Sequence, residues 1–412
     1  MKSVTAARVE RRMEELLQDH CHHLTAPEPG SDHPLDQDPS QGALQEVILQ
    51  AIEAGRGGKR LRALLLCDVW EALDSERNPE REQAAVDLAC ALEVYQTSAL
   101  VHDDIIDGSP RRRGRPAAHL ALSRSAAGND SSDRAPAGPD ARGTGLGILL
   151  GDLLASLSTE IAFQAAADLP QGPAAIGRVF QAMQTAVVTG QVLDMGMEEA
   201  SLDDPERLRS QALHTMAWKT ASYTTMAPLA LGLLAAGADL EGHKKSVRVL
   251  GLDLGLAFQL TDDLLDVAGD DRRTGKPVGG DIREGKRTVL LADTLAMADP
   301  DQAKKVRRLY NSPAERRKDA QVNMVRDLMQ SCGAVDASRR RIADLSARAQ
   351  AEAQALADDL HLSAEGRTIF LKACRRFLPL ATTAGYHERV SSIDAEAGQA
   401  SEVQRAGQDE HE

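Results

Sequence analysis

Two short acidic motifs, far apart in the chain, limit the folds open to it more than any other feature. Each motif places Asp residues at positions i, i+1 and i+4 inside an apolar run; the residues are Asp103, Asp104 and Asp107 in the first set and Asp262, Asp263 and Asp266 in the second. At 3.6 residues per turn, the first and last Asp of each set lie on one face of a helix. Because neighbouring carboxylates repel one another and lose hydration beside apolar side chains, each set requires a neutralising partner.

A hard divalent cation with a preference for oxygen ligands provides this neutralisation. Mg²⁺ bound by carboxylates usually shares its coordination shell with substrate phosphates. The two sets therefore indicate a cluster of Mg²⁺ ions that holds one diphosphate between two helices. The alternative is a pair of solvated acidic helix faces, because short motifs also occur by chance. Repetition of the motif, with apolar residues at the intervening positions, favours the metal site.

The remainder of the sequence predicts an all-α protein. Only 3% of its 412 residues are aromatic, and no alternating strand pattern or further internal repeat is present. Apolar residues recur with helical spacing in most of the chain, which predicts a single-domain bundle of about ten or more helices. The predicted helices cover about 43–54, 60–74, 81–107, 146–169, 174–199, 206–236, 243–269, 286–298, 315–331, 335–358 and 364–383.

Composition divides the chain into a large domain with two flanking segments. Residues 1–40 combine an N-terminal helix with a polar linker rich in Pro, Asp and Ser. The domain covers 41–383 and contains a loop insert of the same composition at 123–145. The acidic tail at 384–412 is predicted to be disordered.

Charge, cysteine use and hydropathy exclude several classes of protein. A net charge of −14 argues against nucleic-acid binding, which requires a basic face. The five cysteines form no CxxC pair, which is typical of buried thiols in a reducing compartment. No run reaches the roughly 20 apolar residues of a membrane span, and no signal peptide is evident. We therefore expect a soluble, cytoplasmic protein.

Basic residues near the acidic sets are candidates for binding a diphosphate directly. Lys59 and Arg62 share a face near a predicted helix N-terminus, where free N–H groups favour an anion. The run 111–115 (RRRGR) directly follows the first acidic set, and Arg side chains match phosphate geometry. Lys276 and Lys286 follow the second set in and after a Gly-rich loop, and Lys219 interrupts an apolar segment. Each of these residues could instead be an ordinary surface charge.

Taken together, the motifs resemble those of the trans-isoprenyl diphosphate synthases, the polyprenyl synthetase family. The matching segments are GGKRLR at 57–62, DDIID at 103–107, RRG at 112–114, GQ at 190–191, KT at 219–220, FQLTDDLLD at 258–266, and GK at 275–276 and 285–286. The resemblance covers roughly residues 40–380. It implies the isoprenoid synthase fold, in which helices surround a central cavity, and an enzyme that joins isopentenyl diphosphate to an allylic diphosphate (dimethylallyl, geranyl or farnesyl).

The resemblance also implies roles for particular residues. Mg²⁺ would be bound by the two acidic sets, that is by Asp103, Asp104, Asp107, Asp262, Asp263 and Asp266. The allylic diphosphate would be held by Arg112, Lys219, Lys276 and Lys286, and isopentenyl diphosphate by Lys59, Arg62 and Arg113. Thr220 and Gln259 would lie near the developing allylic cation. A homodimer is a further expectation from the family.

Two features bear on departures from the family and on its product. Many members have a His seven positions before the first Asp, where this chain has Gln96, which donates a hydrogen bond but carries no charge.

The resemblance also implies that the growing prenyl chain runs beside the helix that carries Asp103, so the size of the residues before the first set bears on product length. Ala99 and Ser98 are small and argue against a product that stops at C15, whereas Tyr95, one turn deeper, suggests a C20 product. Tyr95 could equally be a plain core residue. Geranylgeranyl diphosphate is therefore the predicted product, and a farnesyl or longer-chain product is the alternative.

Other interpretations remain open at this point. A class I terpene cyclase would carry a different second metal motif, and a non-catalytic subunit of a synthase heteromer would lack one acidic set or the basic residues. We expect His102 to be a packed or hydrogen-bonding residue rather than a metal ligand. Gln191 and Asp194 could be buried polar partners or cavity-lining residues.

Overall fold

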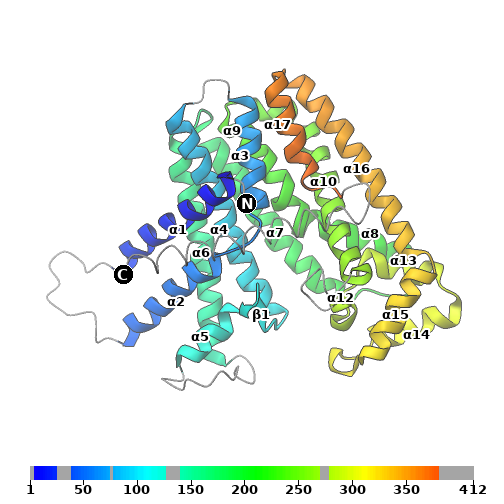
Figure 1. Cartoon of the computed structure of the whole chain (residues 1–412). Helices are drawn as coiled ribbons and strands as arrows, with labels where there is room; N and C mark the ends of the chain where they lie inside the picture. Colours follow the sequence, from blue (N-terminus) through cyan, green and yellow to red (C-terminus); the bar gives the residue numbers. More distant parts are fainter. Residues whose placement is uncertain (1–3, 26–38, 75–77, 127–139, 270–277, 380–412) are drawn as a thin grey trace, which may run out of the picture.

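The computed structural model describes residues 4–25, 39–74, 78–126, 140–269 and 278–379, which are almost entirely helical (Figure 1). The first half contains α1 (Val4–Thr25), α2 (Pro39–Gly55), α3 (Leu61–Leu73), α4 (Pro79–Ile106), β1 (Arg111–Arg112), β2 (Arg115–Pro116), α5 (Ala118–Ala126), α6 (Ala141–Ala167) and α7 (Gly172–Met197). The second half contains α8 (Pro205–Met216), η2 (Ala217–Met226), α9 (Ala227–Ala235), α10 (Leu240–Ala268), α12 (Gly280–Glu284), α13 (Val289–Met297), α14 (Pro300–Tyr310), η3 (Ala314–Arg316), α15 (Asp319–Ser331), α16 (Ala334–Asp359) and α17 (Ala364–Arg375). The predicted all-α bundle of about ten or more helices is confirmed.

The helices enclose two apolar cores that meet along α3 and α9. One core is formed by α1, α2, α4, α5, α6 and α7, and the other by α8, α10 and the helices from α12 to α17. Leu65 of α3 faces the second core and Leu66 faces the first. In Figure 1, α1 and α2 accordingly lie on one side of the bundle, and α16 and α17 lie on the other.

The acidic sets lie in the last turns of the two longest helices, α4 and α10. Asn78 caps α4 by accepting hydrogen bonds from the N–H groups of Glu80 and Arg81, and Asp239 caps α10 by accepting one from Glu241. Both helices end within a few residues of their Asp set. Because the C-terminal end of a helix carries partial negative charge, this placement adds to the repulsion among the carboxylates.

The predicted helix at 206–236 is instead three consecutive elements. Between α8 and α9, the segment η2 is a π-helix, and Pro228 just beyond it has no N–H to donate to the helical ladder. α7 and α10 pack closely on η2 at glycines. A Cβ atom at Gly190 would lie 2.2 Å from the backbone nitrogen of Lys219, and one at Gly255 would lie 2.4 Å from Cβ of Ala221.

Other segments also differ from the prediction. The expected loop at 123–145 is narrower, since α5 continues to Ala126 and α6 begins at Ala141; the rest of that insert lies outside the described residues. Within the arginine run, β1 and β2 pair antiparallel as a short hairpin, with Arg112 opposite Arg115. Helix α14 was not predicted, although Asp299 caps it. The acidic tail at 384–412 lies outside the described residues.

Two helices, α4 and α6, are long and apolar enough to cross a membrane by length and composition alone. Most of the apolar window of α4 (78%) is buried inside the bundle, whereas only 44% of that of α6 is buried. The difference arises because α4 is surrounded by other helices and α6 leaves part of its apolar face uncovered.

Candidate active site

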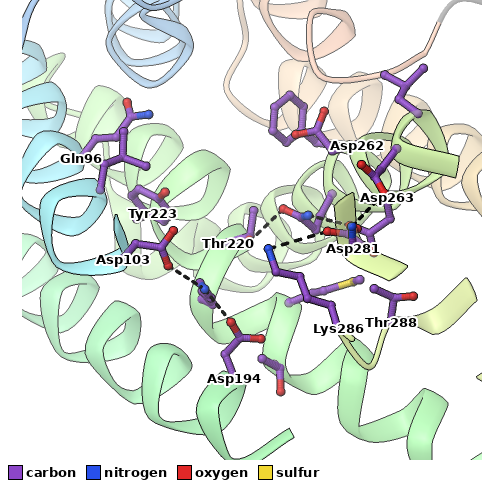
Figure 2. A pocket seen from close by; sticks show the side chains of 18 of the residues that line it. Gln96, Asp103, Asp194, Thr220, Tyr223, Asp262, Asp263, Asp281, Lys286 and Thr288 are labelled. Carbon is purple, nitrogen blue, oxygen red and sulfur yellow. Dashed lines mark hydrogen bonds and ion pairs between the residues drawn. The ribbon is translucent and has the colours of Figure 1, made fainter. Parts of the chain in front are cut away.

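A cavity of about 710 Å³ opens between the two halves of the bundle. The predicted residues that line it are Lys59, Arg62, Gln96, Asp103, Arg112, Arg113, Lys219, Thr220, Gln259, Asp262, Asp263, Asp266 and Lys286. Figure 2 shows Asp103 and Asp194 on one side of this cavity and Asp262, Asp263 and Asp281 on the other. The chain thus brings Asp103 of the first acidic motif and all three Asp residues of the second, remote in sequence, to one cavity.

Basic side chains neutralise the first acidic set. Lys219 Nζ lies 3.1 Å from Asp103 Oδ1 and 2.6 Å from Asp194 Oδ2, so the ammonium bridges α4 and α7. Burial lowers the pKa of the Lys219 ammonium, but Asp103 and Asp194 outweigh this effect and the pKa lies above its ordinary value. Asp104 is buried and accepts two hydrogen bonds from the Arg112 guanidinium, one of them from Nε at 2.9 Å.

Backbone N–H groups and an amide side chain surround the second acidic set. Asp266 accepts hydrogen bonds from the N–H groups of Gly280, at 3.1 Å, and Asp281, at 3.0 Å. Asp263 Oδ1 accepts one from Gln259 Nε2 at 2.8 Å, whereas Asp263 Oδ2 is buried without a hydrogen-bond partner. Burial raises the pKa of Asp263 well above its usual value, and the charge of Asp281 adds to the rise.

The π-helix η2 and α10 share a short chain of polar contacts. The Thr220 hydroxyl donates to Gln259 Oε1 at 3.2 Å, and the Gln259 amide donates in turn to Asp263 (Figure 2). The Gln259 side chain therefore accepts a hydrogen bond through its carbonyl oxygen and donates one through its amide nitrogen. Its carbonyl dipole and the Thr220 oxygen lie at the cavity, where they could face a positively charged carbon.

The basic residues at 59–62 and 113 form one side of the cavity. Arg62 Nη2 donates to Thr224 Oγ1 at 2.7 Å, and its guanidinium carbon lies 3.9 Å from the centroid of the Tyr223 ring, a cation–π contact. Gly58 has φ +97°, and a Cβ there would lie 2.8 Å from Arg113 Nη2, so glycine permits the close approach of the two segments. Lys59, Arg62 and Arg113 therefore all line the same cavity.

Asp281 is a lining residue to which the sequence analysis assigned no role. Its carboxylate lies 3.7 Å from Lys286 Nζ, and Lys286 also pairs with Glu284 at 3.0 Å. Burial raises the pKa of Asp281 to about 7, against the opposing effect of Lys286. The only sequence signal was its position between the two GK pairs, which showed no relation to the Asp sets. Tyr223, Glu93 and Arg60 also line the cavity without having been predicted.

Several predicted residues lie elsewhere or remain undescribed. Asp104 and Asp107 are not among the residues lining the cavity, because Asp104 turns to Arg112 and Asp107 is exposed at the end of α4. Although Asp107 is exposed, neighbouring groups partly desolvate its carboxylate and raise its pKa to about 6, and the charge of Asp103 adds to this effect. Lys276 lies outside the described residues.

The structure also locates four residues whose roles the sequence alone leaves open. Asp194 lines the cavity and Gln191 does not. His102 is a hydrogen-bonding residue as expected, with Nε2 3.2 Å from the Ile148 carbonyl oxygen. Tyr95 lies outside the cavity lining; its hydroxyl donates to the Gln184 carbonyl at 3.1 Å and its ring meets Phe180 edge-on.

Carboxylate oxygens, such as those at this cavity, are the type of ligand that a hard cation prefers. Within the described ranges, no three acidic, His or Cys side chains gather closely enough to hold a metal ion by themselves. Asp103, Asp262 and Asp266 nevertheless present oxygen donors to one cavity, and Asp263 adds a buried oxygen without a partner. An all-oxygen donor set that leaves ligand positions for phosphate is typical of Mg²⁺.

The fold and this paired acidic site define a class of helical enzymes that act on diphosphates, and comparison with known proteins gives the family. The Polyprenyl synthetase family profile matches residues 42–329. The chain therefore belongs to the polyprenyl synthetase family of trans-isoprenyl diphosphate synthases, and it is a transferase of prenyl groups.

Similar proteins differ in the length of the product for which they are named. Geranylgeranyl diphosphate synthase of Sulfolobus acidocaldarius is 33% identical over 251 residues, covering 60% of this chain and 66% of that enzyme. Octaprenyl diphosphate synthase of Escherichia coli is 30% identical over 302 residues, covering 73% and 81%. A solved structure of geranylgeranyl pyrophosphate synthase from Corynebacterium glutamicum, complexed with isoprenyl diphosphate and magnesium, aligns with a TM-score of 0.74 and 29% identity over 92% of this chain and 99% of that one.

Proposed function

We propose that this protein condenses isopentenyl diphosphate with an allylic diphosphate in a Mg²⁺-dependent reaction that yields a short all-trans prenyl diphosphate, with geranylgeranyl diphosphate (C20) as the product. The observation that carries the proposal is the one cavity to which both acidic sets and eight predicted basic or amide side chains contribute; these are Lys59, Arg62, Gln96, Arg112, Arg113, Lys219, Gln259 and Lys286. A cavity rich in cationic groups and carboxylates, with apolar residues between them, suits a substrate that combines a diphosphate with a hydrocarbon chain.

The acidic side chains at the cavity are the proposed Mg²⁺ ligands. Asp103 from α4 and Asp262 and Asp266 from α10 face the same space, and Asp107 completes the first set at the end of its helix. Bound Mg²⁺ would neutralise charge on the diphosphate leaving group. Asp104 is already committed to Arg112, so in this proposal it orients that guanidinium rather than binding metal.

The basic residues assist the departure of pyrophosphate from the allylic substrate. In the proposal, Lys219, Arg112 and Lys286, which line the cavity, stabilise the negative charge that develops as the allylic C–O bond breaks. Thr220 and Gln259 direct oxygen dipoles toward the carbocation that forms. Apolar lining residues such as Leu100 and Phe258 exclude water from it.

The second substrate completes the reaction without a covalent enzyme intermediate. Lys59, Arg62 and Arg113 hold the diphosphate of isopentenyl diphosphate, and its double bond attacks the allylic cation to form the new C–C bond. A proton then leaves the adjacent carbon, with the departing pyrophosphate as acceptor. Positioning and electrostatic stabilisation account for the rate enhancement.

The C20 product is the finer part of the proposal and depends on Tyr95. Ser98 is buried with its hydroxyl on the Gly151 carbonyl, and Tyr95 is fixed three residues earlier by Gln184 and Phe180. Tyr95 lies beyond the residues that line the cavity, so in the proposal a growing chain that leaves the cavity along α4 stops at this ring. Tyr95→Ala should therefore yield products longer than C20; an unchanged product would remove Tyr95 from control of chain length.

An apolar surface on α6 and α7 supports the homodimer. The exposed side chains Leu149, Val188 and Val192 are 60%, 61% and 64% accessible, and Ile148, Phe163 and Met195 accompany them. A surface of this kind commonly marks a protein interface. A second copy of the chain would cover it, and sedimentation at micromolar concentration would measure the assembly.

The cysteines bear on the proposed localisation. All five are free thiols, which supports a reducing compartment such as the cytoplasm.

The activity is tested by incubating the purified protein with radiolabelled isopentenyl diphosphate, one allylic primer at a time and Mg²⁺. Products are dephosphorylated and sized. We expect extension that stops at C20 and is lost when a chelator removes Mg²⁺. Products of other lengths would correct the proposed size. Extension by no primer would contradict the proposal and favour a non-catalytic subunit, and cyclised hydrocarbons would favour a terpene cyclase.

A further inference from the structure

The loop between α2 and α3 has an unusual backbone that requires support from its surroundings. Three of the residues at 56–60 have positive φ angles: Gly57 at 77°, Gly58 at 97° and Arg60 at 54°. Glycine adopts such angles readily, but an arginine does so only where neighbouring groups fix it. The contacts of Arg60 therefore determine the shape of the loop.

A buried ion pair fixes the side of the loop that faces α4. Arg60 is 3% exposed and Glu93 is 2% exposed. Arg60 Nη2 donates to the Gly55 carbonyl at 2.5 Å, and Nη1 lies 3.4 Å from Glu93 Oε2. The other Glu93 oxygen accepts a hydrogen bond from the Ala63 N–H at 3.2 Å, at the start of α3. This pair joins the end of the loop to the first turn of the next helix.

The N-terminal helix α1 holds the opposite side of the same loop. Glu10 Oε1 accepts a hydrogen bond from the Gly57 N–H at 3.2 Å and lies 3.8 Å from Arg60 Nη2. One turn further along α1, Glu14 accepts a hydrogen bond from Arg56 at 2.8 Å. The Arg60 guanidinium therefore lies between a carboxylate of α1 and a carboxylate of α4.

This loop in turn positions two basic residues of the cavity. Lys59 lies within it, between Gly58 and Arg60. Arg113 Nη1 donates to the Arg56 carbonyl at 2.7 Å and to the Gly57 carbonyl at 2.8 Å, so its guanidinium is located by the loop backbone. Any displacement of residues 56–60 would move Lys59 and Arg113 together.

We propose that Glu10 is a positioning residue for the isopentenyl diphosphate site, and that α1 acts through it to keep the 56–60 loop in its binding geometry. The proposal rests on the function assigned above to Lys59 and Arg113. It places a residue from the N-terminal helix, outside the segment that resembles the family, in the support of the catalytic cavity. Glu10 acts through the loop and does not contact substrate.

The test compares two substitutions at Glu10 with one elsewhere on α1. Glu10→Ala removes both the hydrogen bond to Gly57 and the charge beside Arg60, whereas Glu10→Gln retains a hydrogen-bond acceptor. We expect Glu10→Ala to raise the KM for isopentenyl diphosphate about tenfold, with Glu10→Gln intermediate. The KM for the allylic primer should stay within about twofold of wild type, because Arg112 is held by Asp104, and Lys219 and Lys286 by carboxylates remote from the loop.

Arg12→Ala is the matched control. Arg12 also lies on α1, but its guanidinium pairs with Asp87 of α4, at 2.7 and 2.9 Å, and does not contact the loop. Its loss weakens the attachment of α1 and should lower the Tm while leaving both KM values unchanged. An equal rise in KM for Arg12→Ala would show that general loosening of α1 is responsible, and would overturn the proposal. An unchanged KM in both Glu10 variants would also overturn it.

Hydrogen exchange gives a readout that does not require catalysis. The peptide covering residues 56–60 should exchange faster in Glu10→Ala and Glu10→Gln than in wild type or Arg12→Ala. Unaltered exchange in both Glu10 variants would contradict the proposal. If wild type fails to extend any primer, the proposed function fails, and the exchange comparison still decides whether Glu10 fixes the loop.

Discussion

The two acidic sets have the same spacing in the sequence but different surroundings in the fold. On α4, Lys219 bridges Asp103 to Asp194, and Arg112 donates hydrogen bonds to Asp104. Cationic side chains from other elements therefore neutralise the first set. On α10, backbone N–H groups solvate Asp266, and Asp263 retains a buried oxygen without a partner. The i, i+1, i+4 pattern determines the helix face of each carboxylate, whereas the loops that pack beside the helix determine its electrostatic environment.

The largest expected effect comes from removing one metal ligand of each set. Asp103→Ala and Asp262→Ala should each reduce kcat/KM by about 10³-fold or more, because the leaving group loses electrostatic stabilisation from one side. Steady-state assays with isopentenyl diphosphate and an allylic primer measure the loss, and circular dichroism checks the fold. Full activity in either variant would remove that set from the reaction and end the comparison between them.

A smaller loss of activity is expected when the Lys219 ammonium, which contacts the first acidic set, is removed. Lys219→Ala should lower kcat by about 10²-fold, since it takes away a charge at the leaving group and leaves Asp103 and Asp194 facing each other. Lys219→Arg, which retains the charge, is the matched control and should recover part of the rate. A kcat within twofold of wild type for Lys219→Ala would show that the bridge is structural.

The second Asp of each set should affect stability in opposite directions in metal-free protein. Asp104→Asn leaves the Arg112 guanidinium with a weaker partner and should lower the free energy of unfolding by about 2 kcal/mol. Burial disfavours the ionised form of Asp263, and Asp263→Asn removes this penalty while keeping an acceptor for Gln259, so the free energy of unfolding should stay equal or rise. Urea unfolding in the presence of a chelator measures both. Equal destabilisation by the two variants would show that their surroundings do not differ in effect.

A final effect should appear as a pH dependence on the α10 side. The pKa of Asp281 is about 7 in the folded protein, above the ordinary Asp value of about 4 in the unfolded chain. Between these values the folded state binds more protons, so the free energy of unfolding should fall as pH rises from 5 to 8. Urea unfolding of metal-free protein across this range tests the slope, and Asp281→Asn should flatten it. A slope unchanged by Asp281→Asn would assign the effect to other groups, of which Asp107 has the same sign.

The sequence was sufficient to predict the fold class and most of the charged residues at the cavity, because both depend on local patterns. Helical spacing of apolar residues and caps such as Asn78 are visible in the chain itself. Helix α14 was missed although Ala303, Val306, Leu309 and Tyr310 form its buried face. Its many charged residues masked that spacing. The ends of α5 and α6 were missed because loop-forming residues extend into them.

Contacts between segments remote in the chain could not be predicted from the sequence. Asp104 was expected beside a metal ion, yet its orientation toward Arg112 depends on the hairpin formed by β1 and β2. Arg60 was visible only as one letter of a basic motif, and its burial between Glu10 and Glu93 depends on the packing of α1 and α4. In the same way, helical periodicity alone predicted a continuous helix where η2 interrupts it.

The π-helix η2 has a consequence for how this chain can change over evolutionary time. Lys219, Thr220 and Tyr223 all reach the cavity from this one segment, between α-helices that fix its ends. Loss of a single codon within 217–226 would change the register of α9 relative to α8 unless the π-helix rewound as an α-helix. A change of register would turn Pro228 and the apolar residues of α9 away from their cores. Single substitutions in this stretch preserve the register, whereas insertions and deletions alter it.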